Sequence, residues 1–136
     1  MTGTLALIVI AVLAGISVAL QAHVMGAMNR SAGTATGILV TYGVGGLLAA
    51  MFWLTRGAPV DAFRRIPAPS WAAGALGLMI VGGIGYASPR LGLSRTLILT
   101  IAAQLIAAMV LERTFDLRRV AGLALTIAGV WLVVKE

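Results

Sequence analysis

The amino-acid sequence predicts an all-α membrane protein with five transmembrane helices. Hydrophobic residues make up 60% of the 136-residue chain, whereas charged residues make up 10%. The apolar residues gather in five runs, each near the roughly 20 residues that a helix needs to cross a bilayer core. A soluble domain of this size needs a mostly polar surface, which this composition does not supply. We therefore expect a single domain whose solvent is lipid.

The five runs span residues 5–28, 36–55, 71–88, 94–111 and 120–134. No basic residue precedes the first run, so we interpret it as a retained helix and not as a cleaved signal peptide. In the loop after the second run, Pro67 and Pro69 end any helix before Ser70 opens the third run. The apolar and basic residues earlier in this loop fit either a short turn on the membrane surface or an irregular loop.

Capping residues and interfacial aromatic residues mark the ends of the runs. All three tryptophans are expected at headgroup depth, where their rings anchor helices. The helix starts carry side chains whose oxygen atoms are expected to accept hydrogen bonds from free backbone N–H groups. These predicted N-caps are Thr34 or Thr36, Ser70, Ser94 and Asp116.

Five spans place the chain ends, Met1 and Glu136, on opposite sides of the membrane. The positive-inside rule favours a cytoplasmic N-terminus in a cell inner membrane, although the difference in basic residues is small. A small difference fits insertion in both orientations, or pairing with a chain of opposite bias. The N-terminal side carries Arg56, Arg64, Arg65, Arg113, Arg118 and Arg119, and the other side carries Arg30, Arg90, Arg95 and Lys135.

The composition also excludes several functions. The net charge of +6 comes from residues at the ends of the runs, where they meet lipid headgroups, so no nucleic-acid partner is expected. The chain has no cysteine, one histidine and four acidic residues. It shows no set of nucleophile, base and metal ligands. We therefore expect neither an enzyme nor a metal or cofactor site.

Small residues recur along the runs and predict close helix contacts. The seventeen glycines do not favour helix formation, but in a membrane they let backbones approach closely. Gly122, Thr126 and Gly129 share one face of the fifth run. Such a face fits packing within one chain, and it also fits an interface that slides during transport.

Polar side chains at membrane depth are costly, so each is a candidate for substrate binding. Gln21 and Gln104 lie about 12–14 Å below the same membrane surface, near the middle of a core about 30 Å thick. They fit either a shared polar cavity or hydrogen bonds that hold helices together. The other candidates are Ser17 and Thr100, one turn from the two glutamines, and Tyr42 in the second run.

Two further residues are candidates for ion coupling. His23 fits either a proton carrier near neutral pH or a residue at headgroup depth. Glu112, at the end of the fourth run, fits either a surface ion pair with Arg113 or Arg119 or a role in proton coupling. The runs hold no carboxylate at mid-membrane, which argues against a proton exchanger centred on a carboxylate.

The C-terminal part of the chain carries a family pattern. From Leu111 it reads LERTFDLRRVAGLALTIAGVWLVV, in which an acidic residue ends the penultimate helix before Gly-x-x-Leu and Ala-Gly-Val. This pattern resembles the drug/metabolite transporter superfamily. The seven-residue spacing of Gly122 and Gly129 is similar to the dimer contact of its small multidrug resistance branch.

Nearly the whole chain resembles the five-helix YdcZ-like branch of that superfamily. Two positions depart from its pattern, since Met25 stands where asparagine is usual and Glu112 where aspartate is usual. The first-helix glutamate of the small multidrug exporters is absent, so their substrate class is not carried over. The matching segments are Ala14-Gly15, Gln21-Ala22, Tyr42-Gly43-Val44-Gly45, Pro89-Arg90-Leu91-Gly92 and Ala103-Gln104-Leu105.

The resemblance implies half of a ten-helix inverted-repeat transporter, whose two five-helix subunits have opposite orientations. We therefore expect an antiparallel dimeric secondary transporter that moves a small molecule by alternating access. The expected dimer interface holds Gly122, Thr126 and Gly129. The partner is a second copy or a related chain, and the departure at Met25 suggests an unequal pair. The alternatives are a membrane accessory or assembly subunit without transport activity, and a passive ion channel.

Overall fold

The computed structural model describes residues 2–57 and 59–135, so Met1 and Glu136 lie outside the described residues. Each of its five α-helices is long and apolar enough to cross a membrane. The predicted all-α membrane fold is therefore confirmed. The α-helices are α1 (Thr2–Ala32), α2 (Thr34–Thr55), α3 (Ala72–Leu91), α4 (Leu93–Glu112) and α5 (Leu117–Val134), and two 3-10 helices, η1 (Val60–Arg65) and η2 (Ala68–Trp71), connect α2 to α3.

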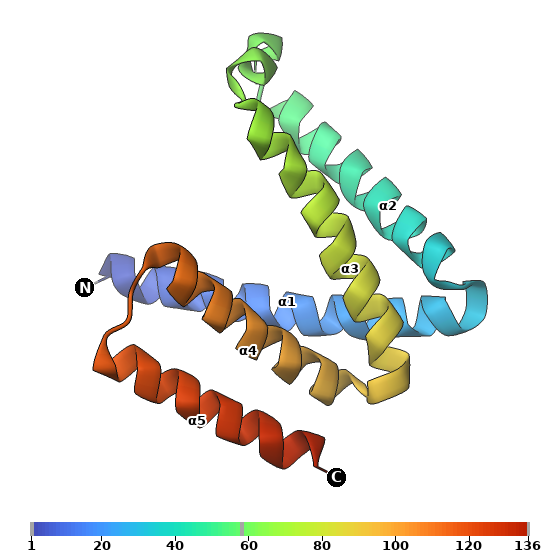
Figure 1. Cartoon of the computed structure of the whole chain (residues 1–136). Coiled ribbons are helices and arrows are strands. Elements are labelled where there is room, and N and C mark those ends of the chain that lie inside the picture. Colours follow the sequence, from blue (N-terminus) through green and yellow to red (C-terminus); the bar gives the residue numbers. More distant parts are fainter. Residues whose placement is uncertain (1, 58, 136) are drawn as a thin grey trace.

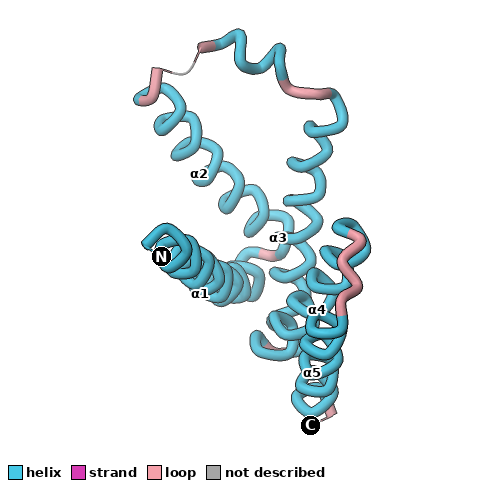
Figure 2. The backbone as a smooth tube through the Cα atoms, turned by 90° about the vertical axis from the view of Figure 1, so that its left-hand side faces the viewer, coloured by secondary structure: helices cyan, strands magenta, loops and turns pink. Residues whose placement is uncertain are grey.

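The helices form two groups (Figure 1). α1, α4 and α5 lie roughly along one direction, and α2 and α3 form a hairpin that leans away from them. α1 packs against α2, α3 and α4, whereas α5 packs only against α4 within the described part of the chain. Figure 2 shows that α2 and α3 diverge toward the segment that holds η1 and η2. The start of α1 and the end of α5 lie at opposite ends of the first group (Figure 1).

Two glycines set the tight turns on the C-terminal side of α1 and α3. Gly33 and Gly92 have φ angles of 82° and 89°, a region that glycine adopts at little cost. They are the residues before α2 and α4, and neither helix has a side-chain N-cap. The predictions that Thr34 or Thr36 caps α2 and that Ser94 caps α4 were therefore wrong.

α3 and α5 begin in different ways. The Asp116 side chain caps α5 as predicted, because it accepts a hydrogen bond of 2.8 Å from the backbone N–H of Arg119. Ser70 instead lies inside η2 and caps nothing, which contradicts the predicted cap. Pro69 fits the first turn of η2, where its missing N–H has no helical partner to lose. η1 shows that the earlier part of this loop is a short helical turn.

The packed core lies where α1 meets α3. Met25 is 2% exposed, and its Cε atom lies 2.9 Å from the point where a Cβ atom on Gly85 would stand. This glycine thus makes room for the methionine side chain. Most other large apolar side chains are exposed, as expected for surfaces that face lipid or a partner.

Candidate transport site

Gln21 borders a narrow groove between α1 and α3. Its amide forms no hydrogen bond with the described residues, whereas Ser17 donates its hydroxyl to the backbone carbonyl of Leu13 at 2.9 Å. The amide is therefore free to bind another molecule, while the Ser17 proton is used within α1. The groove has a volume of about 70 Å³ and is lined by Val18, Gln21, Ala22, Met25, Ile80, Val81 and Ile84.

Gln104 borders a wider groove between α3 and α4. Thr100, one turn earlier, donates its hydroxyl to the backbone carbonyl of Thr96 at 2.8 Å. The Gln104 amide, like that of Gln21, has no hydrogen-bond partner within the described part of the chain. This groove has a volume of about 420 Å³ and is lined by Met79, Ile80, Gly83, Ile84, Thr100, Ala103, Gln104 and Ala107.

The two glutamine grooves are neighbours on α3 but remain distinct. Both include Ile80 and Ile84. The folded chain therefore does not bring Gln21 and Gln104 into one groove, and a shared cavity stays a prediction for the assembled transporter. Among the described residues, neither amide bonds to another helix, so neither glutamine holds helices together within this chain.

Tyr42 and His23 lie apart from both glutamine grooves. Tyr42 is 38% exposed on α2, and its hydroxyl lies 2.8 Å from the point where a Cβ atom on Gly77 of α3 would stand. Gly77 thus leaves space for the tyrosine ring between the two helices. His23 is exposed on α1. Its coupling role stays a prediction.

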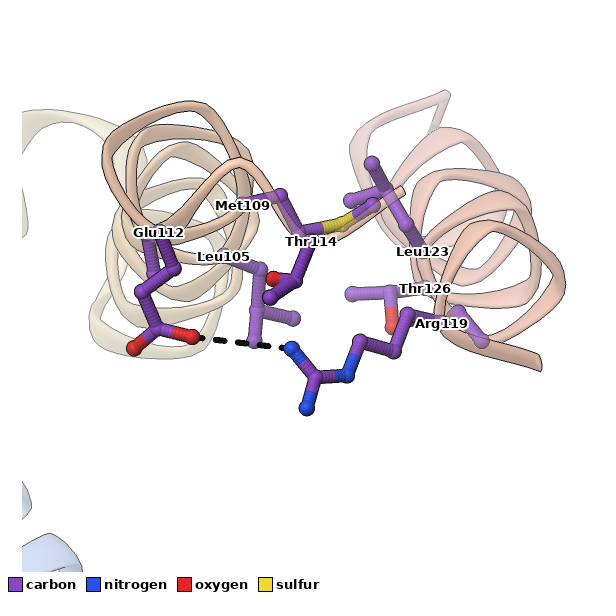
Figure 3. Close-up of a pocket in the computed structure, with 9 residues that line it drawn as sticks. Leu105, Met109, Glu112, Thr114, Arg119, Leu123 and Thr126 are labelled. Atoms are coloured by element: carbon purple, nitrogen blue, oxygen red, sulfur yellow. Dashed lines mark hydrogen bonds and ion pairs between the residues drawn. The ribbon is translucent and has the colours of Figure 1, made fainter. Parts of the chain in front are cut away.

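Glu112 lies at a third groove, between α4 and α5 (Figure 3). Its Oε2 atom lies 3.6 Å from Nη1 of Arg119, and Nε of Arg119 lies 3.1 Å from Oδ2 of Asp116. Arg119 therefore bridges two carboxylates, and it, not Arg113, is the partner of Glu112 within the described residues. Both side chains of the Glu112–Arg119 pair are at least half exposed, so this pair contributes little to stability and is easily opened.

The small-residue face of α5 borders this third groove. Gly122 and Thr126 line it, together with Leu105, Ala108 and Met109 of α4, and its volume is about 390 Å³. A Cβ atom added to Gly122 or Gly129 would meet no atom within 4 Å. The two glycines are thus not packed against another helix in the described part of the chain.

Asn29 is a polar residue that the sequence interpretation missed. Its Nδ2 atom donates a hydrogen bond to the backbone carbonyl of Gly85 on α3. Its Oδ1 atom is buried without a partner, close to Gly37 on α2. The available signal was spacing, because Asn29 follows Gln21 and Met25 at four-residue intervals on one helix face.

The fold and its grooves define an all-α membrane protein that crosses the bilayer five times. The chain matches the family described as "Putative inner membrane exporter, YdcZ" over residues 6–132. This match covers nearly the whole chain, so the protein belongs to that family, and the resemblance to the YdcZ-like branch is confirmed. No curated protein and no solved structure matched the chain.

Proposed function

We propose that this chain is one subunit of an antiparallel dimeric exporter that moves a small molecule across the inner membrane by alternating access. The observation that carries the proposal is membership of an inner-membrane exporter family. Gln21 and Gln104 are the proposed main substrate contacts, because their amides are free and both border grooves. Ser17 and Thr100 would add acceptor oxygens, since their hydroxyl protons are already bonded within their own helices.

Open grooves support a second subunit. The grooves at Gln21 and Gln104 are bordered mainly by apolar side chains and lie at the surface of a chain with few buried residues. A polar solute in either groove would face lipid, which costs several kcal/mol for each unsatisfied group (about 2–7 kcal/mol). A second five-helix subunit over α3 and α4 would enclose the solute and remove this cost.

The positions of two glycines support an antiparallel contact through α5. Gly122 lies five residues after the start of α5 at Leu117, and Gly129 lies five residues before its end at Val134. Two copies of α5 that cross in antiparallel orientation therefore bring Gly122 of one beside Gly129 of the other. A parallel crossing would bring each glycine beside its own copy. Both positions have free space, and small residues allow close packing.

The ion pair between Glu112 and Arg119 supports a coupling role at the same groove. Arg119 keeps Asp116 as a partner when Glu112 is neutralised, so the pair is able to open without leaving the guanidinium unpaired. A partner helix seated beside Gly122 would contact this part of α4 and α5. Opening of the ion pair would then change the contacts at the interface between subunits.

Cysteine crosslinking tests the orientation of the subunits. The natural chain holds no cysteine, so single substitutions give a clean background. Gly122→Cys and Gly129→Cys chains, carried on different affinity tags and co-expressed, should crosslink with each other and not with themselves. Dominant crosslinks between identical variants would contradict the antiparallel arrangement. Ile127→Cys is the control, because Ile127 is exposed on α5 and lies on the opposite side of this helix from the two glycines.

A further inference from the structure

We propose that the ends of α1 and α3, together with the start of α2, form a binding site for a phosphate group. The three helix ends surround a groove with a volume of about 430 Å³. Its position at the ends of membrane-spanning helices matches the depth of lipid headgroups. The residues that line it are Asn29, Arg30, Gly33, Thr34, Pro89 and Arg90.

The positive charge in this groove is not neutralised by described side chains. The three described carboxylates belong to Asp61, Glu112 and Asp116, and each of them pairs with an arginine in another part of the chain. Arg30 and Arg90 thus have no carboxylate partner within residues 2–57 and 59–135. Two guanidinium groups beside one groove favour an anion, and their planar N–H groups match the oxygen atoms of phosphate.

Arg90 is held in place before any ligand binds. Its Nη1 atom donates a hydrogen bond of 2.6 Å to the backbone carbonyl of Tyr86. Its guanidinium carbon lies 3.6 Å from the centre of the Tyr86 ring. These contacts use one N–H group and one face of the guanidinium, and they leave the other N–H groups for a ligand.

An unpartnered hydroxyl lies next to Arg30. Ser88 is 7% exposed, and its Oγ atom is buried without a hydrogen-bond partner among the described residues. Ser88 Oγ and Arg30 Nη1 lie 3.3 Å and 3.6 Å from one common point, the position of a Cβ atom on Gly26. A buried hydroxyl without a partner is costly. Ser88 does not itself line the groove but directly precedes Pro89, which does, and a phosphate oxygen that enters between Arg30 and Ser88 would supply the missing partner.

The start of α2 also favours an anion in the groove, but more weakly than the two arginines do. No side chain caps this helix at Gly33. Its first N–H groups and the positive end of its dipole therefore favour an anion in the groove. The site does not depend on export activity or on dimer formation, because its residues all come from one chain.

Lipid retention and phosphate binding are measured on the purified full-length chain. In the first measurement, native mass spectrometry counts phosphatidylglycerol molecules retained after release from nanodiscs. In the second, inorganic phosphate is added to delipidated protein in detergent, and the thermal midpoint is compared with that in chloride at equal ionic strength. Arg30→Gln and Arg90→Gln should each weaken the affinity for the phosphate group about tenfold, as expected for the loss of one charged hydrogen-bonding group. Each variant should therefore retain less lipid or show a smaller midpoint shift at the same phosphate concentration.

The decisive comparison is between Arg30→Gln and Lys135→Gln. Both substitutions remove one positive charge from the same end of the helices, but Lys135 stands over Trp131 and outside the groove. Arg90→Gln also removes the contacts of Arg90 with Tyr86, whereas Arg30→Gln leaves them in place. Retention of phosphatidylglycerol alone identifies a lipid headgroup as the ligand, and a response to inorganic phosphate alone identifies a soluble anion. The absence of both responses, or an equal loss in Lys135→Gln, would overturn the proposal.

Discussion

The side-chain amide of Asn29 on α1 donates a hydrogen bond to the backbone carbonyl of Gly85 on α3. Only one other side-chain hydrogen bond joins two α-helices in the described part of the chain, from Nε of Arg95 on α4 to the carbonyl of Val133 on α5 at 3.2 Å. Apart from the exposed ion pair between Glu112 and Arg119, the remaining contacts between the described helices rely on close packing. Within the described residues, Asn29 therefore supplies the one side-chain hydrogen bond that joins α1 to α3.

Replacing Asn29 by alanine should destabilise the protein by about 1 kcal/mol, the usual range for a polar contact between membrane helices. The free energy is measured by reversible unfolding in mixed micelles with rising sodium dodecyl sulfate. Ser31→Ala is the matched control, because the Ser31 hydroxyl bonds only to carbonyls of its own helix. An equal loss in both variants would show that the bond to Gly85 is not the cause.

Alanine at Gly85 should be more harmful than alanine at Gly83 on the same helix. A Cβ atom at Gly85 would stand 2.9 Å from both Met25 Cε and Asn29 Nδ2, whereas one at Gly83 would meet no atom within 4 Å. We expect Gly85→Ala to cost about 1–3 kcal/mol through overpacking. Gly83→Ala should be neutral or stabilising, since alanine favours helix formation. Equal unfolding midpoints in the same micelle assay would argue against tight packing of α1 on α3.

Asp116→Ala should destabilise the start of α5 by about 1 kcal/mol through loss of its N-cap. Asp116→Asn should retain most of that stability, because the asparagine oxygen still accepts from the backbone N–H of Arg119. Hydrogen exchange of the amides in the first turn of α5 separates the two variants. Equal protection in both variants would mean that the ion pair with Arg119, and not the cap, holds this turn.

Gln104→Leu should abolish export while leaving the unfolding midpoint nearly unchanged, because its amide has no hydrogen bond to lose within the described residues. The measurement compares the small molecules that accumulate outside cells expressing the natural chain and the variant at equal protein levels. Gln21→Leu should have the same effect. Leu111→Met, at a side chain that is 83% exposed, is the control. Unchanged export by both variants would show that neither glutamine is a main contact of the transported molecule.

The five helices could be predicted because the length and composition of an apolar run almost fix its structure in lipid. Helix ends were less predictable. The apolar run ends at residue 28 because Asn29 and Arg30 are polar, but the backbone continues as helix to Ala32. Polar side chains at headgroup depth do not break a helix, whereas Gly33, with its positive φ, does.

The candidate site was only partly predictable. Depth along the helices selected Gln21 and Gln104 as candidates for one shared cavity, but depth does not define the rotation of each residue around its helix axis. The structure places them in separate grooves on either side of Ile80 and Ile84. Asn29 was missed for a related reason, because its importance comes from Gly85, which is distant in the sequence and close only through the crossing of two helices.

The helices also differ in length. α1 has 31 residues and α5 has 18, so they rise about 46 Å and about 27 Å. A hydrocarbon core is about 30 Å thick. The long α1 fits the core by tilting and is able to stand more upright in a thicker bilayer, whereas α5 is already slightly too short to span it. Longer acyl chains therefore act first on α5, so membrane thickness would control the proposed pairing of subunits through this helix.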